Sequence, residues 1–217
     1  MTKTLTLFLF SLGLTLAVAC KKKKTTTTTP CAQTWTVSKS QDAATTNITG
    51  SYLHLRCDST IIGAAVSVYR TNLTGDFTAT VHYEGFQGGT SGNGWAQLVA
   101  SDPLLKDSGI LVCGINSSSI SAMVADKADD IQSVVASSGT VTIARVGKKI
   151  TVTHQAGIKT ATCTANFLNT ALNIGFQIGS NLGTTFGPLQ IRIKDITVTG
   201  PSGTIFSDGF DCDSRKP

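Results

Sequence analysis

The sequence predicts an all-β domain in which two antiparallel sheets pack as a sandwich. From Cys31 onward, runs of Val, Ile, Thr and aromatic residues alternate with Gly, Asn, Ser and Asp at intervals of roughly eight to twelve residues, as in sandwiches and barrels. Within several runs the apolar residues recur at every second position, which gives a strand one buried and one solvated face. No segment has the apolar period of a long amphipathic helix.

Ten segments have the composition and length of strands. In residues 77–84 the odd positions are apolar or aromatic and the even positions are Thr, His or Glu, and residues 172–178 repeat this alternation with apolar even positions. We therefore expect strands at residues 52–57, 64–69, 77–86, 95–100, 110–115, 120–125, 140–146, 150–154, 172–178 and 189–198.

Two local signals describe how these strands are joined and bent. Residues 145–150 predict a hairpin, because Gly147 can adopt a positive φ. In the last long strand the apolar residues lie at odd positions up to Ile193 and at even positions from Ile196 onward. This shift by one residue predicts a β-bulge near Lys194 or Asp195. Residues 31–217 suffice for one domain with a substantial core. Because the expected strands are too many for a seven-stranded sandwich, they favour a jelly roll of two larger sheets.

The segment before this domain has the features of an export signal. Residues 1–19 have a short basic start and an apolar run, residues 5–19, that is shorter than the roughly 20 residues needed to cross a bilayer. The run ends in Ala17-Val18-Ala19, a small-x-small cleavage pattern. Residues 16–20 resemble the lipobox of bacterial lipoproteins, although Ala17 stands where that family prefers Leu. The resemblance implies lipid attachment at Cys20, and an ordinary signal peptide or a retained membrane anchor are the alternatives.

Residues 20–30 are expected to be a solvated tether between the lipidated cysteine and the domain. Its four lysines could lie against anionic headgroups, at about 1 kcal/mol each. The chain has 18 Lys and Arg residues and 13 Asp and Glu residues; without Lys3 and the tether lysines, 13 basic residues remain and the domain is neutral overall. This balance argues against a nucleic-acid partner. The expected location is the bacterial cell envelope, with the membrane as partner, and secretion is the alternative.

The order of three segments resembles the concanavalin A-like lectin/glucanase superfamily. These are the long strand that opens at residues 75–81, the Gly-rich loop into residues 94–99, and the hairpin 141–154 followed by residues 174–180 and the closing strand 191–200. The resemblance covers most of residues 52–200. It implies the jelly-roll fold and, in many members, saccharide binding or cleavage on a concave sheet, although a fold alone carries no function.

No catalytic or metal-binding group is expected. Retaining glycoside hydrolysis needs two carboxyl groups about 5 Å apart, but Glu84 is the only glutamate, and neither its strand nor that of Asp195 supplies a second acid. The expectation is therefore that the domain is not an enzyme, with a hydrolase of unfamiliar site as a remaining alternative. Asp208, Asp211 and Asp213 are expected to form a solvated terminal turn and not a calcium loop. No cofactor is implied.

A polar sheet face is the candidate for ligand binding. The residues proposed for it are Trp95, His82, Glu84, Gln97 and Arg192. Trp95 follows the Gly-rich loop and could stack on a sugar, or it could be a core indole at the start of a strand. The best interpretation is a cell-envelope lipoprotein whose domain binds a ligand, with a saccharide as the leading candidate. The alternative is a structural or adhesive surface protein without a small ligand.

Five cysteines remain if Cys20 is acylated. An exported chain meets an oxidising compartment, and two bridges with one spare cysteine allow fifteen arrangements. The preferred pair is Cys31 with Cys212, since this bridge would join the first and last segments of the sandwich. The alternative is that all five are reduced and buried.

Overall fold

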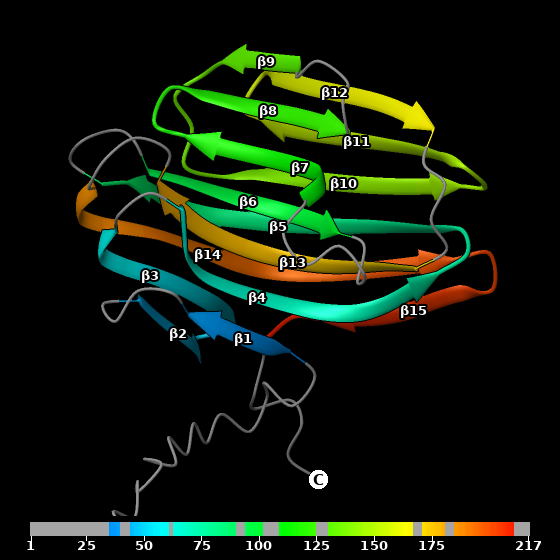
Figure 1. The fold of residues 1–217 in the computed structure, drawn as a ribbon, viewed down its shortest axis with the longest axis horizontal. Helices are drawn as coiled ribbons and strands as arrows, with labels where there is room; N and C mark the ends of the chain where they lie inside the picture. The colour runs from blue at the N-terminus through cyan, green and yellow to red at the C-terminus, as the bar shows by residue number, and fades with distance from the viewer. Residues whose placement is uncertain are drawn as a thin grey trace, which may run out of the picture.

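The chain folds entirely into β-structure wherever its conformation is described. The computed structural model describes residues 35–39, 44–60, 63–89, 94–101, 109–124, 130–166, 171–180 and 185–210, which contain strands and no helix. Figure 1 shows two sheets packed face to face, with the seven-stranded sheet in front. The prediction of an all-β antiparallel jelly-roll sandwich is confirmed.

Two sheets form the layers of the sandwich, and every strand pairs with its neighbours in antiparallel fashion. Sheet A has the order β1 (Thr36–Lys39), β4 (Gly63–Thr74), β13 (Ala171–Ser180), β6 (Gly94–Ser101), β7 (Gly109–Asn116), β8 (Ser119–Val124) and β9 (Asp130–Ser133). Sheet B has the order β12 (Lys159–Asn166), β11 (Lys149–Ala156), β10 (Gly139–Val146), β5 (Phe77–Gly88), β14 (Thr185–Gly200), β3 (Tyr52–Thr60) and β2 (Ala44–Thr49), with β15 (Gly203–Asp208) paired to β14.

The core lies between the two sheets and is built from every second residue of the strands. Phe176 from sheet A and Ile143 from sheet B are among its largest fully buried side chains. Each fully buried side chain of this size contributes roughly 1.5–3 kcal/mol by leaving water. The alternation predicted for residues 77–84 and 172–178 therefore marks which side of each strand faces the core.

All ten expected strands are present, and five more complete the sheets. The additional strands are β1, β2, β9, β12 and β15. In β12 the core-facing residues Ala161 and Cys163 are small, so the strand lacks the strong apolar alternation that marks the others. The predicted hairpin joins β10 to β11 with Gly147 at φ +58°, and the predicted bulge is a register shift between Ile193 and Asp195.

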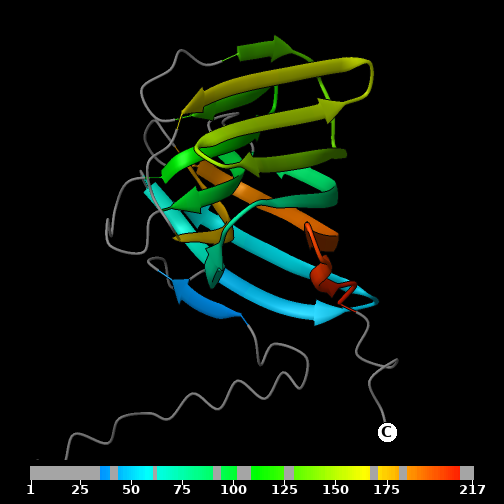
Figure 2. The same cartoon turned by 90° about the vertical axis from the view of Figure 1, so that its right-hand side faces the viewer.

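The two ends of the sandwich are closed in different ways. At one end, the Thr162 backbone N–H of β12 donates to Asp130 of β9 across a distance of 2.7 Å, which ties the edges of the two sheets together. At the other end lie β1 and β15, the first and last strands, as both views show (Figures 1 and 2). The first and last segments of the described chain therefore meet.

Trp35 makes this contact between the first and last segments. Its indole N–H donates to the Asp208 carboxylate at 3.2 Å, and its ring lies 6.1 Å from that of Phe210, centroid to centroid. The Asp208 side chain also accepts the backbone N–H of Phe210 at 2.9 Å. Asp208 is 4% exposed, so the expectation of a solvated turn is wrong for this residue. Asp211 and Asp213 lie outside the described residues.

Candidate functional site

The outer face of sheet A is formed by the residues that alternate with the core positions. In β6, Ala96, Leu98 and Ala100 belong to the core, so Trp95, Gln97 and Val99 lie on the opposite side of the strand. Trp95 and Val99 are nevertheless only 9% and 7% exposed. This outer face is thus shielded from solvent at positions where an ordinary sheet surface would be open.

Two glutamines form the centre of this face. Gln97 of β6 and Gln177 of β13 are directly opposite each other in the sheet, and the same row continues through Gly114 of β7 to Ser121 of β8. Directly opposed residues have Cβ atoms about 4.5–5.5 Å apart, so the two amides can act on one ligand. We call these four residues the amide row.

Gly114 leaves room within the amide row. A Cβ atom placed on this glycine would lie 2.9 Å from the Ser121 hydroxyl oxygen and 3.8 Å from Cγ of Gln97. The two neighbouring side chains therefore use the space that a larger residue would fill. The result is a surface of amide and hydroxyl groups, which donate to and accept from hydroxyl-rich ligands.

Within the part of the chain that the structure describes, two buried polar atoms on this face have no hydrogen-bond partner. These are the indole nitrogen of Trp95 and the side-chain oxygen of Asn173. Leaving such an atom unpaired costs about 1–3 kcal/mol, and other protein atoms cover both of these atoms. Trp95 pairs in register with Gly179, six residues along β13 from Asn173, so the two atoms lie roughly 20 Å apart at opposite ends of the face.

The strands of this face carry no charge. β13, β6, β7 and β8 lie side by side, and none of them contains Asp, Glu, Lys, Arg or His. Their polar chemistry is limited to Gln, Asn, Ser and the indole of Trp95. This absence of charge is the sequence signal that could have singled out the face, and the candidate set lacked Asn173, Gly114 and Ser121.

The five predicted ligand residues do not form one surface. Trp95 and Gln97 lie on the outer face of sheet A, whereas His82, Glu84 and Arg192 lie on the outer face of sheet B, on the other side of the sandwich. All five lie at the strand positions that alternate with the core-facing residues. The alternation along each strand could not show that the two groups belong to different sheets of the sandwich.

The sheet B group consists of one partly exposed ion pair and one partly exposed histidine–carboxylate hydrogen bond. Arg192 bonds to Glu84 at 2.8 Å and its guanidinium lies 5.3 Å above the ring of Tyr52. His82 lies 2.6 Å from Asp195. Such pairs stabilise a protein by about 0–1 kcal/mol each. Each of these four side chains therefore has a partner within the group.

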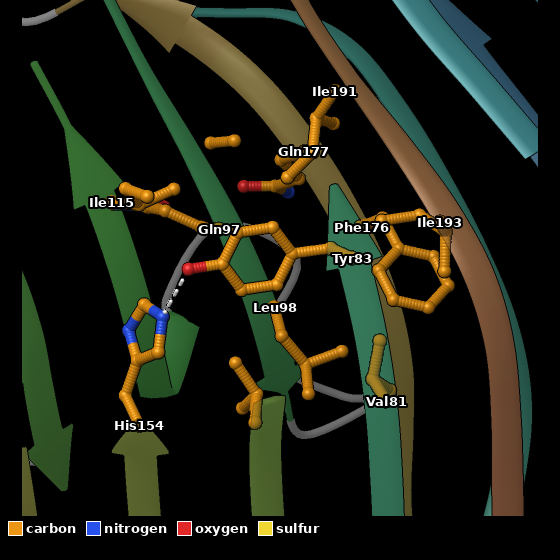
Figure 3. A pocket seen from close by; sticks show the side chains of 12 residues that line it. Val81, Tyr83, Gln97, Leu98, Ile115, His154, Phe176, Gln177, Ile191 and Ile193 are labelled. Atoms are coloured by element: carbon orange, nitrogen blue, oxygen red, sulfur yellow. Dashed lines mark hydrogen bonds between the residues drawn. The ribbon is translucent and has the colours of Figure 1, made fainter. Parts of the chain in front are cut away.

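A tyrosine–histidine pair lies in the interior, between the sheets. Figure 3 shows the Tyr83 hydroxyl directed at the imidazole of His154, and the oxygen and Nε2 are 2.8 Å apart. The Nδ1 atom of His154 lies 3.4 Å from the carbonyl oxygen of Ser121, which can only accept. Nδ1 therefore carries the proton and Nε2 accepts the tyrosine hydroxyl. Burial lowers the pKa of His154 to about 4, although the carbonyls of Ser121 and Gly114 act in the opposite direction.

This pair could exchange protons but cannot reach a polymer. Tyr83 is 5% and His154 1% exposed, and both project into a small apolar cavity whose other lining residues include Phe176, Leu98 and Ile193 (Figure 3). Acid–base catalysis requires hydrogen-bond contact with the reacting group. We therefore assign the pair a structural role in the core.

Within the described ranges, no group of three or more His, Cys, Asp or Glu residues is placed to hold a metal ion. These same residues contain no helix that is long and apolar enough to cross a membrane. Cys20, Cys31 and Cys212 lie outside the described residues, as do residues 1–34 as a whole.

The fold is shared with carbohydrate-processing proteins. No protein-family model matches the chain, and no curated protein resembles it in sequence. An alginate lyase of polysaccharide lyase family 7 superposes with a TM-score of 0.59 at 10% identity, covering 77% of this chain and 94% of the lyase. An alginate lyase from Corynebacterium sp. gives 0.54 at 11% identity, covering 71% and 80%. A sialidase gives 0.56 at 12% identity, covering 77% of this chain and 17% of the sialidase.

The likeness corrects one expectation. The prediction that the domain is not an enzyme depended on the missing pair of facing acids, but the structural neighbours include lyases, which are enzymes. A lyase breaks its bond without hydrolysis, so the acid pair of a glycoside hydrolase is not a requirement of this fold. At about 10% identity the likeness shows the jelly-roll fold and transfers no activity.

Proposed function

We propose that the domain binds a polysaccharide along the outer face of sheet A. The observation that carries the proposal is the amide row, in which Gln97 and Gln177 are directly opposite each other and Gly114 leaves room beside Gln97. A chain of sugars presents hydroxyl donors and acceptors at regular intervals, which matches the uncharged amide and hydroxyl groups of the amide row. The fold likeness to two alginate lyases supports the same class of ligand.

The experiment compares matched glutamine variants in polysaccharide binding. Gln97→Ala combined with Gln177→Ala removes both central amides, whereas Gln155→Ala removes an exposed glutamine from the outer face of sheet B. With a panel of neutral and uronate polysaccharides, titration calorimetry should show binding that falls roughly tenfold or more in the double variant, because two hydrogen bonds are lost. Gln155→Ala should bind as the unchanged protein does.

Three outcomes count against this proposal. Equal binding by the double variant would place the site elsewhere, and equal loss in Gln155→Ala would show a general effect on folding. Absence of binding to every saccharide at millimolar concentration would favour an adhesive or structural surface protein.

Polysaccharide cleavage is the second candidate, and the likeness to two lyases is the observation that favours it. Incubation with alginate and with the polysaccharide that binds best should then release unsaturated ends, which absorb ultraviolet light. If no such ends appear, the function is binding.

We also propose that the domain is displayed on the bacterial cell envelope through a lipid on Cys20. The small-x-small pattern before Cys20 and the Lys- and Thr-rich tether after it support this location. Cys20→Ser should release the protein from the membrane fraction of cells that express the full chain. A variant that stays in the membrane fraction would contradict acylation at this cysteine.

A further inference from the structure

We propose that Tyr83 and His154 position the amide row from inside the sandwich, so that polysaccharide binding on the outer face of sheet A depends on a histidine that the polysaccharide cannot touch. The inference rests on the binding function proposed above and adds the groups that hold its site in place. Both are positioning residues, because both are buried between the sheets.

The amide row borders the cavity that holds the tyrosine–histidine pair. Gln97 and Gln177 contribute to the lining of this cavity from sheet A, and His154 enters it from β11 of sheet B (Figure 3). The other two members of the row, Gly114 and Ser121, present their backbone carbonyl groups to the imidazole of His154. All four members of the row therefore border the space around one buried side chain.

Two hydrogen bonds in sequence connect the centre of sheet B to this row. The Tyr83 hydroxyl of β5 donates to Nε2 of His154 at 2.8 Å, and Nδ1 of His154 donates to the Ser121 carbonyl oxygen at 3.4 Å. The rings of Tyr83 and His154 lie 5.6 Å apart, centroid to centroid, in an edge-to-face arrangement that aromatic pairs prefer. The imidazole is thereby held against β8, the strand that carries Ser121.

An apolar side chain at position 154 would fill the same space without holding the row. Burying a polar group is unfavourable unless hydrogen bonds satisfy it, and a fully satisfied buried network specifies one arrangement of the elements that it joins. His154 is 1% exposed and both of its ring nitrogens have partners. Because these partners lie on β5 and β8, the network fixes the position of Ser121 and of β8 relative to sheet B.

Protonation of His154 should disturb this arrangement. The neutral ring accepts the Tyr83 hydroxyl on Nε2, whereas the protonated ring carries a hydrogen on both nitrogens and can only donate. Burial lowers the pKa of His154 to about 4, so the ring is neutral at pH 7 and takes up its proton as the pH falls through 4. Other titratable or charged side chains on the inner side of neighbouring strands are Cys163 of β12, Arg145 of β10 and Asp130 of β9. They are retained in every variant below.

Two substitutions of His154 separate positioning from packing. Glutamine can donate to the Ser121 carbonyl and accept from Tyr83, as histidine does, whereas leucine fills the space and does neither. The ligand is a neutral polysaccharide, because the carboxylates of a uronate polymer would titrate in the same pH range. Calorimetry at pH 7 should give similar affinities for the unchanged protein and His154→Gln, and roughly tenfold weaker binding for His154→Leu.

Tyr83→Phe provides a second variant in case His154→Leu does not fold. It removes only the hydroxyl that orients the imidazole, and binding should weaken roughly threefold or more. Urea unfolding establishes that each variant is folded before binding is measured. Affinity equal to that of the unchanged protein in a folded His154→Leu, or in Tyr83→Phe, would overturn the inference.

The pH profile of binding is a measurement that a purely structural role would not change. Apparent affinity falls in proportion to the neutral fraction of His154, so it should decrease roughly twofold by pH 4 and about fourfold by pH 3.5. His154→Gln should bind equally well over this range, whereas His82→Gln, on the outer face of sheet B, should keep the decline. An equal decline in His154→Gln would assign the pH dependence to another group and refute the role of His154.

The proposed function and this inference fail in different ways. If the unchanged protein binds no saccharide, the proposed function is wrong, and the coupling is then read without ligand from the backbone amide resonances of Gly114 and Ser121. These resonances should shift with a midpoint near pH 4 in the unchanged protein and stay constant in His154→Gln. Resonances of the unchanged protein that do not respond to this titration would refute the inference whether or not a saccharide binds.

Discussion

The outer faces of the two sheets differ, although both are built from the polar positions of alternating strands. On sheet A the four strands β13, β6, β7 and β8 carry no charged residue, and outer positions such as Trp95 and Val99 are buried. On sheet B the outer face carries the Arg192–Glu84 and Arg56–Asp58 ion pairs, whose side chains are between 35% and 64% exposed. Ion pairs satisfied by one another are typical of a solvated surface.

The two faces also differ in whether their polar groups have hydrogen-bond partners. Charged groups on sheet B find partners in neighbouring side chains, whereas among the described residues sheet A keeps a buried donor on Trp95 and a buried acceptor on Asn173 without a hydrogen-bond partner. Native proteins leave few buried polar groups unpaired, and those that remain need an explanation. The proposed site on sheet A lies at the amide row, where the side chains of Gln97, Gln177 and Ser121 are partly exposed and can contact a ligand.

A buried charge on sheet A should give the largest effect. Val99→Asp places a carboxylate at a position that is 7% exposed and has no charged neighbour on its own or the adjoining strands. The free energy of unfolding should fall by roughly 3 kcal/mol or more, because the carboxylate loses water without gaining a partner. Urea unfolding measures the change.

The matched substitution on sheet B is Thr153→Asp. Thr153 lies on the outer face between Thr142 and Thr162, and the change there should cost about 1 kcal/mol or less, chiefly from strand propensity. Similar losses of unfolding free energy in Val99→Asp and Thr153→Asp would show that the two outer faces are equally open to solvent. That result would contradict the difference between the faces.

The interior histidine should make stability depend on pH. The folded protein holds the pKa of His154 at about 4, below the ordinary 6.5, so the unfolded chain binds the proton first as the pH falls. Stability from this group is therefore complete above pH 6.5 and declines toward pH 4, by roughly 3 kcal/mol in total. Urea unfolding at pH 7 and pH 4.5 should show the decline.

Two glutamine substitutions separate the interior from the surface. His154→Gln should remove most of this pH dependence, whereas His82→Gln, on the outer face of sheet B, should leave it in place. An unchanged pH dependence in His154→Gln would assign the effect to other groups.

A smaller effect should distinguish two glycines at positive φ. Gly85 at +64° and Gly147 at +58° both favour glycine, so alanine at either position should cost about 1 kcal/mol. Only at Gly85 would the new Cβ lie 2.9 Å from Nε of Arg192, whereas nothing lies within 4 Å at Gly147. Gly85→Ala should therefore lose more stability. That excess should disappear in an Arg192→Ala background, and its persistence would show that Arg192 does not occupy this space.

Sequence patterns located most of the fold and little of the site. Alternation identified strands with large inward residues, and the parity change after Ile193 located the bulge. It missed β12, whose inward residues are small, and β1, which is exposed along its length. For the site, the sequence pattern marked Gln97 and Arg192 alike as residues on the polar side of a strand. Strands of both sheets have such a polar side, so the pattern could not show that the two residues lie in different sheets.

The sequence by itself determined that this chain forms alternating strands, a hairpin at Gly147 and an antiparallel sandwich, since these follow from residues close together in the chain. Tertiary structure alone decided that Gln97 stands opposite Gln177, that Arg192 lies on the far side of the sandwich, and that Trp35 meets Asp208. Those relations depend on which distant strands pair and in which register, and a one-residue change of register would turn every side chain to the other face.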